Sequence, residues 1–154
     1  LGPELDDLTA SAIWTANLLE FLPLILTEPL IVSQFFWENG TAVAGNTDIG
    51  IYSFDGQTKL GSTGSTANSG TSQIQVVDVT NFVLPPNVRL WLSLGCDSSS
   101  QTYFRETTTV AAMDFFGVKQ QASGWSSGLP ATITPAAPPL ASIPLFGFTG
   151  ASVI

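Results

Sequence analysis

Apolar and polar residues alternate with a period of two over several short stretches of the chain. This alternation is typical of a β-strand with one buried face. The clearest case is residues 88–97, VRLWLSLGCD. One face of this stretch carries Leu90, Leu92, Leu94 and Cys96, and the other carries Arg89, Trp91 and Ser93. The pattern predicts a strand in which Cys96 is a small core residue.

The same alternation predicts further short strands. In residues 46–56, one face carries Ile49 and Ile51, and the other carries Asp48, Gly50, Tyr52 and Phe54. In residues 72–80, Ile74 and Val76 face one way, and Val77 and Val79 face the other. The remaining predicted strands cover residues 19–26, 29–38, 58–67 and 103–109, the last followed by a short irregular or helical piece.

Turn-forming residues separate these strands. Asn39-Gly40, Asp55-Gly56 and residues 68–70 all have turn composition. Asn39-Gly40-Thr41 also matches the acceptor sequence for N-glycosylation, which matters only if the host secretes the protein.

The two ends of the chain have a different character. Residues 5–19 fit either a short helix, because Leu5, Leu8 and Ala12 would share a helical face, or an extended arm. From residue 115 to 154 the only charged residue is Lys119, and five prolines forbid a long helix. This segment is too apolar for ordinary disorder. We therefore expect it to complete the chain's own sandwich or to grip a neighbouring subunit.

Short strands without strand–helix alternation predict an all-β fold. We expect an antiparallel β-sandwich or jelly roll with an extended C-terminal arm. The length of 154 residues is typical of one domain. Within it we expect an N-terminal arm or short helix (residues 1–20), a sandwich core (21–114) and the proline-spaced apolar segment (115–154).

The stretch from residue 38 to 66 contains six glycines, which raises the question of a phosphate-binding loop. Such a loop needs its glycines between a strand and the start of a helix, and the Walker form needs Lys followed by Ser or Thr. Here Lys59 is followed by Leu60, and the glycines recur across strands and turns. Two strands and their turns are therefore the better interpretation.

Composition and charge exclude several partners. The chain carries 4 basic and 12 acidic residues, for a net charge of −8, which repels nucleic acid and anionic membrane surfaces. No apolar run approaches the roughly 20 residues of a membrane-spanning helix. Only 10% of residues are charged, so much of the surface must be uncharged and prone to contact other proteins.

The chemistry of the side chains favours a protein that is not an enzyme. The absence of histidine excludes Ser-His and Cys-His dyads and histidine metal sites. A pair of carboxylates could still act in a cleft, drawn from Asp48, Asp55, Asp78, Asp97, Glu106 and Asp114. Each of these acids sits at a turn or on a plausible solvent face, so we expect structural roles. Calcium could bind Asp48, Asp55, Asp78 or Asp97, but the spacing supports no site, and we expect no metal or cofactor.

Aromatic residues are the main candidates for contact with another molecule. The candidates for ligand stacking or for an interface are Trp37, Tyr52, Trp91 and Trp125. Trp91 lies opposite an apolar strand face, so it stacks on a ligand, packs under another subunit or is covered by the second sheet. A core or interface position is favoured for it. In the C-terminal segment the interface candidates are Leu145, Phe146 and Phe148.

The middle of the chain resembles small β-rich proteins encoded by tailed bacteriophages. The resemblance covers residues 30–105 and the closing PLFGFTG of residues 144–150. Its motifs are Trp37-Glu38-Asn39-Gly40, the strand from Gly45 to Tyr52, the hairpin from Gly56 to Thr66 and the strand from Gln75 to Thr80. No catalytic residues carry over from this resemblance.

The resemblance implies a virion component, either a capsid decoration protein or a head or tail appendage. Contact with other virion proteins, such as the major capsid protein, would follow. The nearly uncharged, proline-spaced apolar C-terminal segment separately leads us to expect a homo-oligomer such as a trimer, in which another subunit covers that segment. The alternative is a module of a tail tip or fibre that binds a host-surface glycan through the aromatic candidates.

Overall fold

The computed structural model describes residues 9–107, 109–122, 124–136 and 142–152. Its one helix among these residues, α1, covers Val110–Phe115 and begins at Thr109, whose side chain accepts a hydrogen bond from the Ala112 amide. The strands are β1 Thr9–Ile13, β2 Leu19–Ile25, β3 Leu30–Glu38, β4 Asn46–Ser53, β5 Lys59–Ser62, β6 Thr66–Ala67, β7 Ile74–Leu84, β8 Arg89–Cys96, β9 Thr102–Thr107, β10 Lys119–Gln121, β11 Ser142–Pro144 and β12 Phe146–Ser152.

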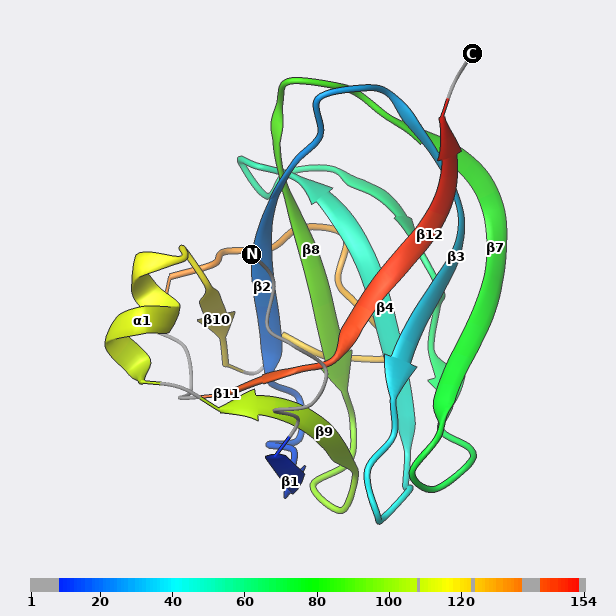
Figure 1. Ribbon diagram of the computed structural model, residues 1–154, viewed down its shortest axis with the longest axis vertical. Helices are drawn as coiled ribbons and strands as arrows, with labels where there is room; N and C mark the ends of the chain where they lie inside the picture. The colour runs from blue at the N-terminus through cyan, green and yellow to red at the C-terminus, as the bar shows by residue number, and fades with distance from the viewer. Residues whose placement is uncertain (1–8, 108, 123, 137–141, 153–154) are drawn as a thin grey trace.

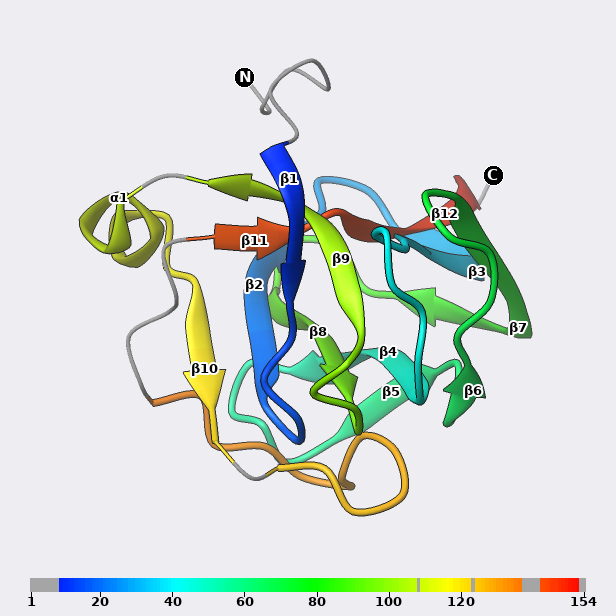
Figure 2. The same cartoon turned by 90° about the horizontal axis from the view of Figure 1, so that it is seen from below.

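The strands form antiparallel sheets in two layers (Figures 1 and 2). The central sheet has the order β10-β2-β8-β4-β5, and β6 also pairs with β4. The opposite layer contains a sheet of order β12-β3-β7 and a smaller one of order β1-β9-β11. These two meet at Leu145, whose amide donates to Phe104 at 3.0 Å and whose carbonyl accepts from Glu38 at 3.0 Å.

The predicted all-β antiparallel sandwich is confirmed. The strand order does not establish the jelly roll, which stays a prediction. The predicted hairpin of the glycine-rich segment is also present, because β4 pairs with β5 and the Gly56 amide donates to the Ser53 carbonyl at 2.9 Å. Gly56 has a φ of +74°, a value that favours glycine in such a turn.

The helix considered for residues 5–19 is wrong for the part that the structure describes. Thr9–Ile13 forms β1, which pairs with β9. The Arg105 guanidinium on β9 donates to the carbonyls of Ala12 at 3.1 Å and Ile13 at 2.9 Å. Pairing of the backbone with β9 therefore replaces the hydrogen bonds that a helix would make. Residues 5–8 lie outside the described residues.

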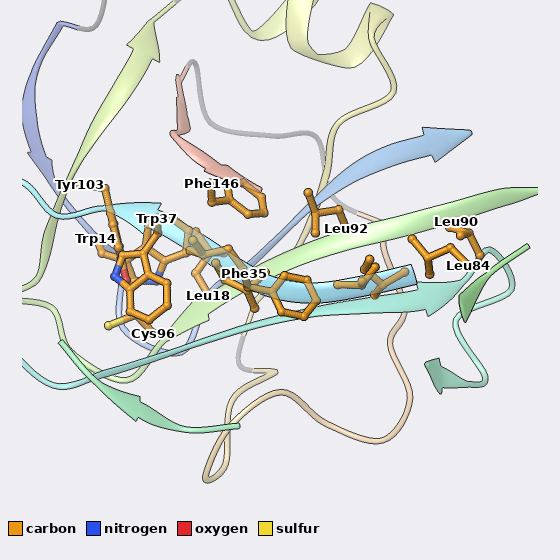
Figure 3. Packing of buried hydrophobic residues seen from close by; sticks show 14 residues of the cluster. Trp14, Leu18, Phe35, Trp37, Leu84, Leu90, Leu92, Cys96, Tyr103 and Phe146 are labelled. Carbon is orange, nitrogen blue, oxygen red and sulfur yellow. The ribbon is translucent and has the colours of Figure 1, made fainter. Parts of the chain in front are cut away.

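The main core lies between the two layers (Figure 3). The apolar face predicted for β8 points into it, because Leu90, Leu92, Leu94 and Cys96 all belong to this cluster. Ile49 and Ile51 of β4 join them, as expected. The opposite layer contributes Val32, Phe35, Trp37, Leu84, Tyr103 and Phe146. Burial in these apolar surroundings raises the pKa of the Cys96 thiol.

Three parts of the C-terminal segment, namely β10, residues 124–136 and β12, pack on their own chain. β10 pairs with β2 at one edge of the central sheet, and β12 pairs with β3 in the opposite layer. Residues 124–136 run along the outer side of the central sheet, below β8 and β4 in Figure 2. Leu129 and Ile133 are buried there with Leu19, Phe21, Tyr52 and Trp91 in a second apolar cluster. Both faces of the central sheet are therefore covered.

Candidate functional site

Three of the aromatic candidates are inside the protein and offer no free ring to a ligand. Trp37 and Tyr52 are 0% exposed and Trp91 is 7% exposed. Trp91 is covered by residues 124–136 and not by the second sheet, and its indole N–H donates to the Phe54 carbonyl at 2.9 Å. Ligand stacking by these three rings is therefore wrong, and the alternative core position holds for them.

The other candidates are also engaged within the chain. Trp125 is half-buried against the second apolar cluster. Phe146 is 7% exposed, and Phe148 packs edge-on against Phe35 with ring centroids 6.3 Å apart. Leu145 is half-buried at the junction of the two smaller sheets. None of these four residues presents an open aromatic platform or a free arm.

Asp48 departs from its predicted place on a turn or solvent face, because it is only 1% exposed. Its carboxylate accepts from the Leu129 amide at 2.8 Å and from the Thr63 hydroxyl at 2.9 Å. Lys59 donates to the Leu129 carbonyl at 2.8 Å, and Tyr52 donates to the Pro130 carbonyl at 2.6 Å. Burial raises the pKa of Asp48, while the hydrogen bonds from Leu129 and Thr63 and the positive charge of Lys59 oppose that shift. Together, Asp48, Lys59 and Tyr52 attach residues 124–136, which cover the outer side of the central sheet, to that sheet.

Of the five remaining carboxylates that we considered for catalysis, Asp55, Asp97, Asp114 and Asp78 have local partners, and the buried Oε2 of Glu106 accepts no hydrogen bond from the described residues. Asp55 accepts from Ser53 and from the Gln57 amide, and these hydrogen bonds lower its pKa. Asp97 accepts from the backbone and side chain of Asn46 at 2.7 and 2.9 Å. Asp114 pairs with Lys119, and Asp78 accepts from Gln34 at 2.7 Å. Glu106 lies half-buried on β9. Across the described ranges, no group of three or more acidic or cysteine side chains could hold a metal ion.

Asn39 belongs to a buried polar network at one end of the sandwich. It is 0% exposed and accepts from Trp37 Nε1 and Gln101 Nε2, both at 3.0 Å. Its amide group donates to the Ser69 carbonyl at 2.7 Å and to Gln75 Oε1 at 3.1 Å. The folded protein therefore cannot present this asparagine for glycosylation, although the acceptor sequence is present.

An exposed apolar face remains on the outer side of the β12-β3-β7 sheet. Ile74, Val76 and Val83 of β7 are 58%, 52% and 56% exposed. In register with them on β3 are Phe36 opposite Val76 and Ile31 opposite Val83, both half-buried. We call these five residues, with the polar row of Thr149, Gln34 and Asp78 between them, the β7 face. It forms one side of the molecule (Figure 1).

The polar row crosses all three strands of this sheet. Thr149 donates to Gln34 Oε1 at 3.1 Å, and Gln34 Nε2 donates to Asp78 Oδ1 at 2.7 Å. The β7 face thus has two apolar areas separated by one ordered line of polar groups. The alternation in the sequence predicted that Ile74 and Val76 share one face of their strand. It did not predict which face meets solvent, because both faces are apolar.

The surface has two further features, and the second borders the β7 face at Asp78. Phe115 and Phe116 at the end of α1 are 85% and 67% exposed. A groove of about 440 Å³ lies between the edge strands β5 and β7, lined by residues 60–63 and 78–82. Phe82 is one of the lining residues, and its ring fills the space beside Gly61. No described helix is both long and apolar enough to cross a membrane.

Comparisons with protein-family models, with curated proteins and with solved structures give no match for this chain.

Proposed function

We propose that this protein is a non-enzymatic structural component of a tailed-bacteriophage virion, of the capsid decoration or appendage type. It docks on another virion protein through the β7 face. The observation that carries the proposal is this exposed apolar face on a sandwich whose own chain covers both faces of the central sheet. Exposed apolar faces of this kind mark surfaces that contact other proteins.

Composition and sequence resemblance support the same role. With only 10% charged residues, the protein is suited to a crowded assembly in which much of its surface is covered. The resemblance to small β-rich phage proteins supports the virion as its location. The carboxylates favour a structural role over catalysis, because Asp48, Asp55 and Asp97 each hold a strand, turn or loop in place.

The glycan-binding alternative has less support. A sugar platform needs an exposed aromatic ring, and Trp37, Tyr52 and Trp91 lie in the two apolar clusters. The homo-oligomer expected from the sequence stays a prediction. The reason for expecting it is weakened, because β10 and β12 of the C-terminal segment pair with strands of their own chain.

Incorporation into particles tests the proposal. Particles of the phage that encodes the chain are purified and analysed by mass spectrometry, with wild-type protein and with two variants supplied in its place. Val76→Asp changes the β7 face, and Val88→Asp changes a similarly exposed valine (42%) outside it. We expect wild type and Val88→Asp in the particles, and Val76→Asp in soluble, folded form only. Absence of the wild type from particles, or equal incorporation of both variants, contradicts the proposal.

A further inference from the structure

The charges on the β7 face are all of one sign. Asp78 lies in the middle of the face, exposed between the apolar areas. Glu38 lies at one end of it, opposite Ile74 in the strand register. Its neighbour Trp37 points into the core, so alternation directs Glu38 outward. Any surface that covers this face must therefore accommodate the two carboxylates of Asp78 and Glu38.

The Asp78 carboxylate is held in position by its neighbours. Gln34 donates to Oδ1, and Thr149 in turn holds the Gln34 side chain. No described residue donates to Asp78 Oδ2. One oxygen is thus fixed by the sheet, and the other is open to a donor from outside. Burying this carboxylate under an uncharged apolar surface would cost free energy, because its water would be lost without replacement.

A second copy of this chain is poorly suited to supply that donor. The sequence has four basic residues, and none lies on the β7 face. Lys59 is bound to the Leu129 carbonyl, and Lys119 pairs with Asp114. Arg105 is 3% exposed, and the Arg89 guanidinium lies 4.5 Å from the Phe54 ring centroid on the other sheet. Two β7 faces packed together would bring carboxylates together without a cation.

We propose that the β7 face docks a different protein, whose contact surface carries a lysine or arginine side chain among apolar residues. The apolar areas around Ile74, Val76 and Val83 pack against the apolar part of that surface, and Asp78 Oδ2 accepts from its basic group. Asp78 therefore determines specificity, because it selects a cationic partner and disfavours a neutral or acidic one. This inference rests on the proposed function only for where the partner is found.

Small probes test the chemistry of the face without a virion. Methyl-labelled protein at physiological ionic strength is titrated with hexylammonium, and separately with hexanesulfonate and hexanol, and the methyl resonances are followed by NMR. We expect saturable shifts of Ile74, Val76 and Val83 with hexylammonium, at a lower concentration than with hexanol, and no saturation with hexanesulfonate. The variant Asp78→Asn should weaken hexylammonium binding about two- to fivefold, as expected for a solvent-accessible charge pair.

Two controls separate this result from general attraction and from self-association. Asp55→Asn removes an exposed carboxylate outside the face and should leave hexylammonium binding at these methyl groups unchanged. Sedimentation velocity should show the same oligomeric state for the wild type and Val76→Asp in the concentration range of the titration. The inference is overturned if hexanesulfonate or hexanol binds as well as hexylammonium, if no probe saturates at this face, or if Asp78→Asn has no effect. It is also overturned by a dimer that Val76→Asp dissociates.

The two tests can fail separately. Incorporation of the wild type into particles with no preference for hexylammonium would leave the virion role intact and refute the basic partner. A clear preference for hexylammonium in a protein absent from particles would refute the virion role and keep the chemistry of the face.

Discussion

The Asp48 carboxylate on β4 accepts a hydrogen bond from the Leu129 amide at 2.8 Å, and so joins a strand to a segment 81 residues later in the chain. The same carboxylate accepts from Thr63. Because Leu129 packs over Tyr52 and Trp91, this hydrogen bond helps to keep the outer side of the central sheet covered.

Replacing Asp48 tests this attachment. Asp48→Ala leaves the Leu129 amide without its acceptor and removes one of two acceptors near the Thr63 hydroxyl, and we expect the free energy of unfolding to fall by about 2 to 3 kcal/mol. Urea denaturation followed by tryptophan fluorescence measures the change. The matched control is Asp114→Ala, which removes an exposed carboxylate and should change stability by no more than about 0.5 kcal/mol. Equal effects of the two substitutions would contradict a special role for Asp48.

Glu20 should make stability depend on pH. It is 1% exposed, and burial raises its pKa to about 7, against opposing effects of its hydrogen bond from Gln120 and of the charge of Arg105. The folded protein therefore keeps a proton that the unfolded chain releases near its ordinary pKa of 4.5. This contribution is fully present below about pH 4.5, is lost as the pH rises to about 7, and amounts to roughly 3 kcal/mol. Asp48, whose pKa is also raised, acts in the same direction.

The variant Glu20→Gln removes the titrating group while keeping a side chain of similar size. We expect its stability to change much less between pH 4.5 and 7.5 than that of the wild type, and to exceed the wild-type value at the upper end. Chemical denaturation at a series of pH values gives both curves. Glu28→Gln, on an exposed loop, should keep the wild-type slope. Parallel curves for Glu20→Gln and the wild type would show that Glu20 is not responsible.

Asn39 should contribute strongly to stability through the buried polar network at one end of the sandwich. The change Asn39→Ala leaves Trp37 Nε1 and Gln101 Nε2 without one of their acceptors inside the protein, and we expect a loss of about 2 to 4 kcal/mol. Thermal unfolding by circular dichroism measures it. Asn81→Ala, an exposed asparagine on β7, is the control and should change little. A small effect at Asn39 would mean that water replaces its hydrogen bonds.

Gly61 should not tolerate a side chain. A Cβ at this position would overlap the Phe82 ring, which lies between the two layers. We expect Gly61→Val to lower the free energy of unfolding by about 1 to 3 kcal/mol. Gly64→Ala is a useful comparison, because no atom lies within 4 Å of the added Cβ and only its φ of +68° opposes the change. If Phe82→Ala restores much of the stability of Gly61→Val, the overlap is confirmed as the cause.

The sequence predicted the faces of the strands better than their surroundings. Alternation placed Leu90, Leu92 and Leu94 on one side of β8, and the structure has them in the main core. It could not place Trp91, because its cover comes from residues 124–136, an irregular segment with no periodicity of its own. For the same reason Asp48 looked like a surface acid, since its partner Leu129 is distant in the chain.

The β7 face was only half predictable. The alternation put Ile74 and Val76 on one side and Val77 and Val79 on the other, as the structure shows. Both sides are apolar, so hydropathy gave no reason to choose the side that meets solvent. The choice is made by β3, whose buried residues Val32, Phe35 and Trp37 fix which side of the whole sheet turns inward.

Coverage of the central sheet by Leu129 and Ile133, together with the pairing of β3 with β12, has a consequence for biosynthesis. Strands β3, β4 and β8 are synthesised before the segments that cover them or pair with them, so a ribosome-bound intermediate carries tryptophan and tyrosine side chains open to water. We expect the native state to form only after residues 146–152 have left the exit tunnel, and chaperones to act on this chain before that point.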